Sequence, residues 1–372
     1  MAASLLRRIL VTVKNPILPG FHPDASACQV AEGPQILKKD GLYYLLTAAG
    51  GTGYNHAAVV ARSESVWGPY AISPYHPLLT SAHYPDNPLQ KSGHASFLRK
   101  GGDWYITHLC ARPLTERGNC PLGRETALQK IEWDGGWPRL SGGGNAPFIE
   151  VEVPGPDGIA LETNNGKHAD FNEKELPGWF HTLRGPLEDA ASLTERPGWL
   201  RLYGRESPAS LHRQALVAAR WQSFRFRAET LMEFRPKSFQ QMAGLICIYN
   251  TENWMYACLS GDNGAPALNV LVCENKKLRY AAQGVDVPEN TPVYLAAEVD
   301  REHLQFYYSI CKTDSAKNRL PLGGELPADH LSDDYIEKNG LVFTGAFIGI
   351  ACHDLDDRSA IADFDYFSYN EY

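Results

Sequence analysis

Two acidic residues near the N-terminus are the first candidates for chemistry. Asp24 lies near the end of a proline-rich phrase, Asn15–Ser26, whose three prolines hold the chain extended before a predicted strand. Glu32 follows eight positions later, in the sequence Glu32-Gly-Pro. Each residue also has an ordinary structural interpretation, because an aspartate after proline commonly caps a turn and Glu-Gly-Pro suits a surface turn. Taken singly, neither residue establishes a function.

Other kinds of site are disfavoured by residue types and spacing. The eight cysteines show no CxxC spacing, so they indicate neither a zinc site nor a disulfide framework. The glycine-rich stretch 134–145 lacks the strand and helix that flank a phosphate-binding loop. A net charge of −8 excludes a basic nucleic-acid-binding protein. No stretch approaches the roughly 20 apolar residues of a membrane span. We therefore expect neither nucleic acid nor membrane as a partner.

The elements that position these residues are predicted to be strands. Segments 36–47 and 97–108 each indicate a strand, a basic glycine-containing turn and an aromatic-rich strand. A third strand follows each of them, at 56–62 and 126–133. A repeated antiparallel sheet with a period of about 60 residues is typical of propeller blades. Two unrelated hairpins of a sandwich are the alternative.

The second half of the chain has a different pattern of polar and apolar residues. A polar, glycine- and proline-rich stretch after Glu150 marks the best domain boundary. From Asp170 onward, alternating strand-like runs recur with almost no helical periodicity, which indicates a two-sheet sandwich. We therefore expect an all-β protein with an incomplete propeller over residues 15–155 and a β-sandwich over residues 168–372.

Several phrases together resemble glycoside hydrolase family 43. They follow the family's order along the chain, at Asn15–Ser26, Glu32–Pro34, Gly50–Gly53, Gly93–Ala95 and Cys120–Thr126. Three more phrases are similar to the β-xylosidase branch of that family, at 240–245, 249–254 and 362–367. That branch joins a five-bladed β-propeller to a C-terminal, concanavalin-like β-sandwich, so the resemblance implies these two domains.

The resemblance also implies an activity. The branch removes xylose or arabinofuranose from the non-reducing ends of xylo-oligosaccharides with inversion of configuration. Inverting hydrolysis uses a carboxylate base that activates water and a carboxylic acid that protonates the leaving oxygen. Asp24 matches the base and Glu32 matches the acid, which must hold a proton near neutrality. A xylo-oligosaccharide or an arabinoside is therefore the expected substrate.

Four further residues match substrate-binding positions of the family. Arg124 matches an arginine that grips sugar hydroxyls, although a surface pair with its neighbour Glu125 is an alternative. His94 matches an active-site histidine, and Thr52 matches a position in the pocket wall. Phe347 matches a pocket position contributed by the sandwich, and a simple core aromatic is an equal alternative.

The spacing of the two carboxylates departs from the family. In its members a long stretch of chain separates base from acid, because each begins the innermost strand of a different blade. Here Asp24 and Glu32 are eight positions apart, so the rest of one blade and the whole of the next are missing after Val30. An aspartate that tunes the acid is lost with them. Eight extended residues span up to about 26 Å, whereas an inverting pair needs about 6.5–9.5 Å. We expect activity well below that of an intact relative.

Three interpretations of the chain stay open. The first is a working exo-glycosidase, the second is a non-catalytic remnant with a carbohydrate-binding or structural sandwich, and the third is an artefact of the gene model or of splicing. No cofactor is expected. Calcium near His94 stays open, because some relatives bind a divalent ion there, but the chain has no acidic cluster with calcium-loop spacing.

The cellular location and the assembly state rest on weaker signals. Arg7 and Arg8 interrupt the N-terminal apolar run before it reaches the roughly 7–15 residues of a secretion signal. This favours a cytoplasmic protein, with a short organelle-targeting helix as the alternative. A homo-oligomer stays open.

Overall fold

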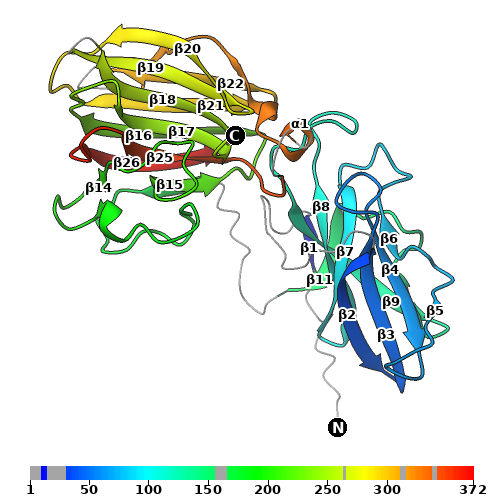
Figure 1. Cartoon of the computed structure of the whole chain (residues 1–372). Helices are drawn as coiled ribbons and strands as arrows, with labels where there is room; N and C mark the ends of the chain where they lie inside the picture. The colour runs from blue at the N-terminus through cyan, green and yellow to red at the C-terminus, as the bar shows by residue number, and fades with distance from the viewer. Residues whose placement is uncertain (1–9, 15–30, 156–165, 263–264, 311–315, 337–341) are drawn as a thin grey trace. The chain divides into compact units, whose positions relative to one another are not determined.

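The structure is a computed structural model that describes residues 10–14, 31–155, 166–262, 265–310, 316–336 and 342–372 (Figure 1). Almost every regular element among these residues is a strand, which confirms the prediction of an all-β protein. The chain separates into two compact units, Met1–Glu162 and Thr163–Tyr372, and each is described by itself. In the described part of the chain, no helix has the length and apolar character needed to cross a membrane.

The first unit contains two sheets of the same plan and one smaller sheet. The first sheet has the order β2-β3-β4-β5 with β6 beside β4, and the second has the order β10-β9-β8-β7. A two-stranded sheet joins β1 to β11. The bounds are β1 Leu10–Lys14, β2 Ala31–Lys39, β3 Leu42–Ala49, β4 Ala57–Ser63, β5 Ala71–Ile72, β6 Leu79–Thr80, β7 Gln90–Lys100, β8 Asp103–Ala111, β9 Glu125–Asp134, β10 Trp137–Leu140 and β11 Glu150–Pro154.

The predicted basic turns are two-residue hairpins. In the turn between β2 and β3, Asp40 and Gly41 have φ angles of 50° and 82°. In the turn between β7 and β8, Gly101 and Gly102 have φ angles of 61° and 92°. Two successive positive φ angles match the twist of the flanking strands, and aspartate and glycine adopt them at little cost. The residue types at the two turns therefore favour both hairpins.

The two large sheets of the first unit pack against each other through an apolar cluster. The cluster draws buried residues from both sheets, namely Tyr44, Leu46, Ala58, Val60, Leu78, Leu79, Ala95, Ile106, Ile131 and Leu140. Trp133 packs at its edge, with its ring 4.9 Å from that of Tyr44. The hydroxyl of Tyr44 donates a hydrogen bond of 2.6 Å to the carbonyl of Gly136, which ties β3 to the turn of the other sheet. This cluster fixes the relative position of β2, β4 and β7.

The opposite face of the first sheet is also apolar. Ile36, Leu45, Ala61 and Ile72 are register partners on four successive strands and form one row across that face. Ile36 is 52% exposed and Ile72 is 65% exposed. A sheet with one wet face normally alternates apolar and polar residues. This sheet instead has the composition of a sheet covered on both sides.

The second unit is a sandwich of two antiparallel sheets (Figure 1). One sheet has the order β13-β14-β26-β16-β21-β22-β23, with β12 beside β26 and β24 beside β22, and the other has the order β15-β25-β17-β18-β19-β20. Its elements are β12 Gly166–Ala169, η1 Glu188–Ala190, β13 Ala191–Ser192, β14 Leu200–Tyr203, β15 Ala215–Arg220, β16 Arg225–Phe234, β17 Gln241–Asn250, β18 Asn253–Asp262, β19 Ala265–Glu274, β20 Lys277–Asp286, β21 Val293–Asp300, β22 His303–Ser309, β23 Leu320–Pro321, β24 Leu326–Pro327, η2 Ala328–His330, α1 Asp333–Ile336, β25 Phe347–Asp354 and β26 Ile361–Glu371.

The sandwich has a core of its own. Strands β17 and β25 are buried along almost their whole length, and they contact β21 and β26 of the facing sheet. Large aromatic side chains from the two sheets, such as Phe226 and Tyr256, are fully buried. The two sheets of the second unit therefore bury an apolar core between them. In the first unit, the first sheet buries residues on one face, whereas Ile36 and Ile72 on its other face are exposed.

Adjacent leucines on β3 provide a test of this difference between the two faces. Leu46 is fully buried between the sheets, so Leu46→Ala should lower the free energy of unfolding by about 2–5 kcal/mol. Leu45 lies on the opposite face of the sheet and is only partly buried, so Leu45→Ala should cost about 1 kcal/mol or less. Urea unfolding followed by amide exchange in β3 measures both changes. Equal losses would contradict the assignment of an uncovered face.

Candidate active site

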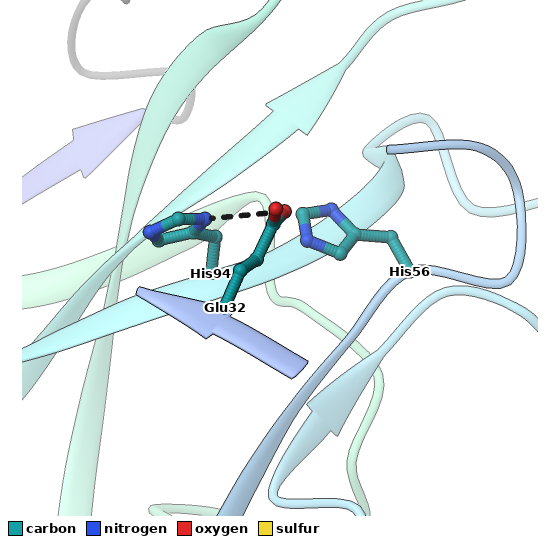
Figure 2. A group of neighbouring side chains, drawn as sticks. All are labelled: Glu32, His56 and His94. Atoms are coloured by element: carbon teal, nitrogen blue, oxygen red, sulfur yellow. Dashed lines mark ion pairs between the residues drawn. The ribbon is translucent and has the colours of Figure 1, made fainter. Parts of the chain in front are cut away.

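Glu32, His56 and His94 gather in the first unit. Glu32 is the second residue of β2, His56 immediately precedes β4, and His94 lies in the first half of β7. One ligand atom from each side chain lies within 4.8 Å of those of the other two. Figure 2 shows the carboxylate of Glu32 between the two imidazole rings. Two of these residues, Glu32 and His94, were site residues predicted from the sequence, and the structure brings them together.

Irregular pairing of β2 and β7 with their neighbouring strands creates this cluster. The register of β2 shifts between Glu32 and Gln35, and that of β7 shifts on both sides of Gly93. Such bulges redirect side chains that a regular strand would place elsewhere. His94 itself has a φ angle of 50°, which is uncommon for a residue with a side chain. Backbone strain at a cluster of titratable groups is a frequent property of functional sites.

Two glycines let the imidazole rings approach the backbone. A Cβ atom on Gly33, whose φ is +55°, would lie 2.0 Å from Nε2 of His94. A Cβ atom on Gly93 would lie 2.5 Å from Cδ2 of His56. Gly33 of β2 thus makes room for the ring of His94 on β7, and Gly93 of β7 makes room for the ring of His56 before β4. Neither position accepts a larger side chain without moving a histidine.

His56 is a buried and oriented imidazole. It is 1% exposed, and its Nδ1 lies 3.0 Å from the carbonyl oxygen of Lys91. Burial is the main cause that lowers the pKa of His56 to about 4, with smaller lowering effects from His94 and Arg124 and opposing effects from the Lys91 hydrogen bond and Glu32. The ring is therefore neutral near pH 7. With Nδ1 donating to the carbonyl of Lys91, the lone pair is on Nε2.

The ion pair between His94 and Glu32 completes the cluster. Nδ1 of His94 lies 3.8 Å from Oε1 of Glu32, and the two side chains are 10% and 15% exposed. The carboxyl group of Glu32 is therefore close to two imidazoles and largely shielded from solvent.

Arg124 and Thr52 lie on loops of the first unit. Arg124 immediately precedes β9, and its charge acts on His56. Its neighbour Glu125 is completely buried and accepts a bidentate pair from Arg112, with distances of 2.7 and 2.8 Å. Thr52 lies on the loop between β3 and β4, four residues before His56.

Asp24 and Phe347 are the two predicted site residues whose relation to the cluster stays a prediction. Asp24 falls outside the described residues, so its predicted pairing with Glu32 stays a prediction. Phe347 begins β25 in the second unit, where the guanidinium of Arg220 lies 4.5 Å from its ring and the ring of His181 contacts its edge. It packs at the margin of an apolar cluster of the sandwich. Its proposed role in a sugar pocket also stays a prediction.

The sequence analysis missed His56. Residues 56–62 were interpreted only as a third strand, yet this histidine stands at the start of that strand, as Glu32 stands at the start of β2. The glycine-rich loop before it offered a further signal. A polar residue that follows such a loop and stands at the start of a strand is therefore a candidate site residue in either sheet.

Comparison with known proteins identifies the family. The model for glycosyl hydrolases family 43 matches residues 14–138, and the model for the beta xylosidase C-terminal concanavalin A-like domain matches residues 168–370. This chain belongs to glycoside hydrolase family 43. The first unit is accordingly the propeller-type region of that family and the second unit is its concanavalin A-like sandwich, as the sequence predicted.

Individual relatives support this assignment. A β-xylosidase of Bacillus subtilis (strain 168) is 41% identical over 92% of this chain, and a putative β-xylosidase of Escherichia coli (strain K12) is 43% identical over 91%. The crystal structure of a xylan β-1,4-xylosidase from Bacillus halodurans C-125 superposes with a TM-score of 0.87 and 41% identity, over 92% of this chain. The chain spans 66%, 65% and 65% of these three proteins, respectively.

Calcium does not suit the cluster that surrounds His94. Calcium takes about 6–8 oxygen ligands. Among the described residues, the group that could hold a metal ion consists of two imidazoles and a single carboxylate. This donor set is too poor in oxygen for a calcium site.

The buried histidines predict how the stability of the first unit depends on pH. The pKa of His56 and that of His108 are both lowered to about 4 by burial. Between about pH 6.5 and 4 the unfolded chain binds protons that the native unit rejects, so stability is full above pH 6.5 and falls as the pH falls. Each histidine contributes up to about 1.4 kcal/mol per pH unit. His108→Gln should therefore give a shallower dependence.

Urea unfolding at several pH values, followed by amide exchange in β8, measures this dependence. The difference between the original chain and the His108→Gln variant isolates His108, because the carboxyl groups titrate in both. Parallel pH profiles for the two chains would contradict the assignment of a native, neutral His108.

Proposed function

We propose that this chain is a glycoside hydrolase of the β-xylosidase or α-L-arabinofuranosidase type. It removes single sugars from the non-reducing ends of xylo-oligosaccharides or arabinosides with inversion, at a rate reduced by missing parts of the propeller. The single observation that carries this proposal is the carboxyl group of Glu32, held at the start of an inner strand between two imidazoles and largely shielded from solvent.

The names of further relatives support both sugar specificities. A xylosidase/arabinosidase of Humicola insolens is 38% identical over 91% of this chain. A non-reducing end α-L-arabinofuranosidase of Bacteroides ovatus is 29% identical over 91%. Both kinds of substrate present an acetal oxygen whose departure requires a proton. The proposed substrate class is therefore stated at the level of xylosides and arabinosides.

Glu32 is the proposed acid. Its carboxyl group donates a proton to the glycosidic oxygen as the bond to the anomeric carbon breaks, and Asp24 accepts a proton from the water that attacks the opposite face of the sugar. His56 remains neutral and holds a fixed orientation beside the acid. The positive charge of Arg124 lies near enough to act on His56.

The reduced rate follows from the composition of the cluster. Among the described residues, Glu32 is the only carboxylate in the group with His56 and His94. The carboxylate that tunes the acid in the family has no counterpart there. Positioned acid–base groups are each worth about 10²–10⁴-fold in rate. We therefore expect xylobiose turnover well below the usual enzyme range of about 1–10³ per second.

A substrate comparison tests the assignment of the acid. Glu32→Gln should lower kcat/KM for xylobiose by about 10²–10⁴-fold, because its leaving group needs a proton. The loss for 4-nitrophenyl β-xyloside should be much smaller, because nitrophenolate departs without protonation. The exposed Glu64 provides a matched control in the same unit, and Glu64→Gln should leave both values unchanged.

Replacement of Asp24 should affect the two substrates equally. Asp24→Asn should abolish hydrolysis of both substrates, since activated water is needed whatever the leaving group. Proton NMR of the first-formed sugar should show inverted anomeric configuration. Similar losses on the two substrates for Glu32→Gln would remove Glu32 from the role of acid.

A non-catalytic remnant is the second candidate function. One observation favours it: the sandwich has a buried core, whereas the first sheet of the propeller-type region exposes Ile36 and Ile72 on its outer face. In that case the sandwich would serve as a carbohydrate-binding or structural module. Absence of turnover by the original chain on xylobiose, 4-nitrophenyl β-xyloside and 4-nitrophenyl α-L-arabinofuranoside would favour this candidate.

A further inference from the structure

The first sheet of the first unit has an outer face that is poor in charge. Tyr44 and Leu46 of β3 point into the apolar cluster, so the residues that alternate with them lie on the opposite side of the sheet. Strand register extends this outer face over β2 to β5, and its residues are Ile36, Lys38, Tyr43, Leu45, Thr47, Val59, Ala61, Ser63 and Ile72. Lys38 carries the one charge of this set, and its Nζ lies 5.0 Å above the ring of Tyr43.

Exposure of the outer face is greatest at its two edges. Ile36 on β2 is 52% exposed and Ile72 on β5 is 65% exposed, whereas Leu45 and Ala61 between them are half-buried. A contiguous apolar patch on a protein surface commonly marks an interaction site. The same sheet packs through its inner face against a second sheet. The outer face has the residue types to pack against another sheet in the same way.

The strand register gives the outer face a complementary pattern of residue sizes. Tyr43 on β3 pairs with Ser63 on β4, and Leu45 on β3 pairs with Ala61 on β4. The larger residue of each pair is therefore on β3. A two-fold axis parallel to the strands and midway between β3 and β4 would place β3 of each copy over β4 of the other. Large residues would then meet small ones, which is how packed layers interdigitate.

We propose that the outer face is a dimer interface and that its occupant is the outer face of a second copy of this chain, related by this axis. Leu45 packs against the partner's Ala61, and Ile36 at one edge packs against the partner's Ile72 at the other. The same patch is used on both copies, so the contact closes at two chains. The strands of the two copies are nearly aligned, as in other face-to-face sheet packings.

The area of the outer face predicts a weak dimer. Three strands and a short fourth, spaced about 4.8 Å apart and about seven residues long, present roughly 400 Å². Two copies together bury about 1,000 Å² once the relief of the side chains is counted, which is at the lower limit for a specific interface. We therefore expect a dissociation constant on the order of 10 μM. Because Lys38 carries the only charge of the set, added salt should not weaken the dimer.

The interface contains none of Glu32, His56 and His94, and it needs no residue of the second unit. Association of two copies is therefore independent of whether the chain hydrolyses a xyloside. Failure of the proposed function would leave the dimer intact, and a monomer would leave the assignment of Glu32 unchanged.

Analytical ultracentrifugation of the full chain tests the proposal. Between about 1 and 100 μM, which bracket the expected dissociation constant, the mass should rise from one chain toward two. Ile36→Lys and Ile72→Lys should each weaken association by about 10-fold or more, because each would bury an unpaired ammonium group. Both isoleucines are exposed in a single copy, so both variants should keep the circular dichroism of the original chain.

A double variant tests the direction of the axis. Ile36 faces the partner's Ile72 in this arrangement, so Ile36→Lys combined with Ile72→Glu in one chain places opposite charges together at both edges. This variant should associate more tightly than either single lysine variant. With an axis across the strands, Ile36 would face the partner's Ile36 and the second substitution would not restore association. Absence of recovery would thus overturn the proposed arrangement.

A matched control comes from the second unit. Leu278 on β20 is 60% exposed, which is close to the exposure of the two isoleucines. Leu278→Lys should leave the dissociation constant unchanged, and loss of the dimer in this variant would assign the interface to the sandwich. A chain that stays monomeric at about 100 μM, or a dimer that survives both Ile36→Lys and Ile72→Lys, would also overturn the proposal. In the monomeric case, the outer face would meet a different protein or none.

Discussion

The close approach of two inner strands, β2 and β7, is the constraint on which the site depends. Gly33 allows this approach, because a side chain there would collide with the ring of His94, and Gly93 lets His56, which precedes β4, lie against β7. The apolar cluster between the two large sheets stabilises this approach. Packing away from the carboxyl group therefore sets the distances between the Glu32 carboxyl group and the two imidazoles.

Local sequence accounts for the strands and turns, and less well for the site. The hairpins at Asp40-Gly41 and Gly101-Gly102 could be predicted because glycine and aspartate suit the backbone angles that short hairpins need. The sandwich could be predicted from alternation along its strands. The pairing of Glu32 with His94 could not, because it depends on bulges and on packing between sheets. Only resemblance to a family drew attention to both residues.

His56 shows why the remaining part of the site escaped sequence analysis. Its importance comes from burial, from a carbonyl acceptor on Lys91 and from a lone pair that faces Glu32, and none of these is encoded in neighbouring residues. Arg112 is similar, since its bidentate pair with Glu125 spans 13 positions and binds the residue that had been considered a partner for Arg124. Roles of this kind emerge only when separate strands are placed side by side.

The apolar row Ile36–Leu45–Ala61–Ile72 carries information about the history of the chain. If the outer face of this sheet has long been bare, selection no longer favours large apolar side chains there, and descendants should drift toward threonine, lysine or glutamate at Ile36 and Ile72. If those two positions stay apolar across diverging lineages, the face is covered during the life of the protein. The residues found at positions 36 and 72 in related chains therefore indicate whether another sheet covers this face.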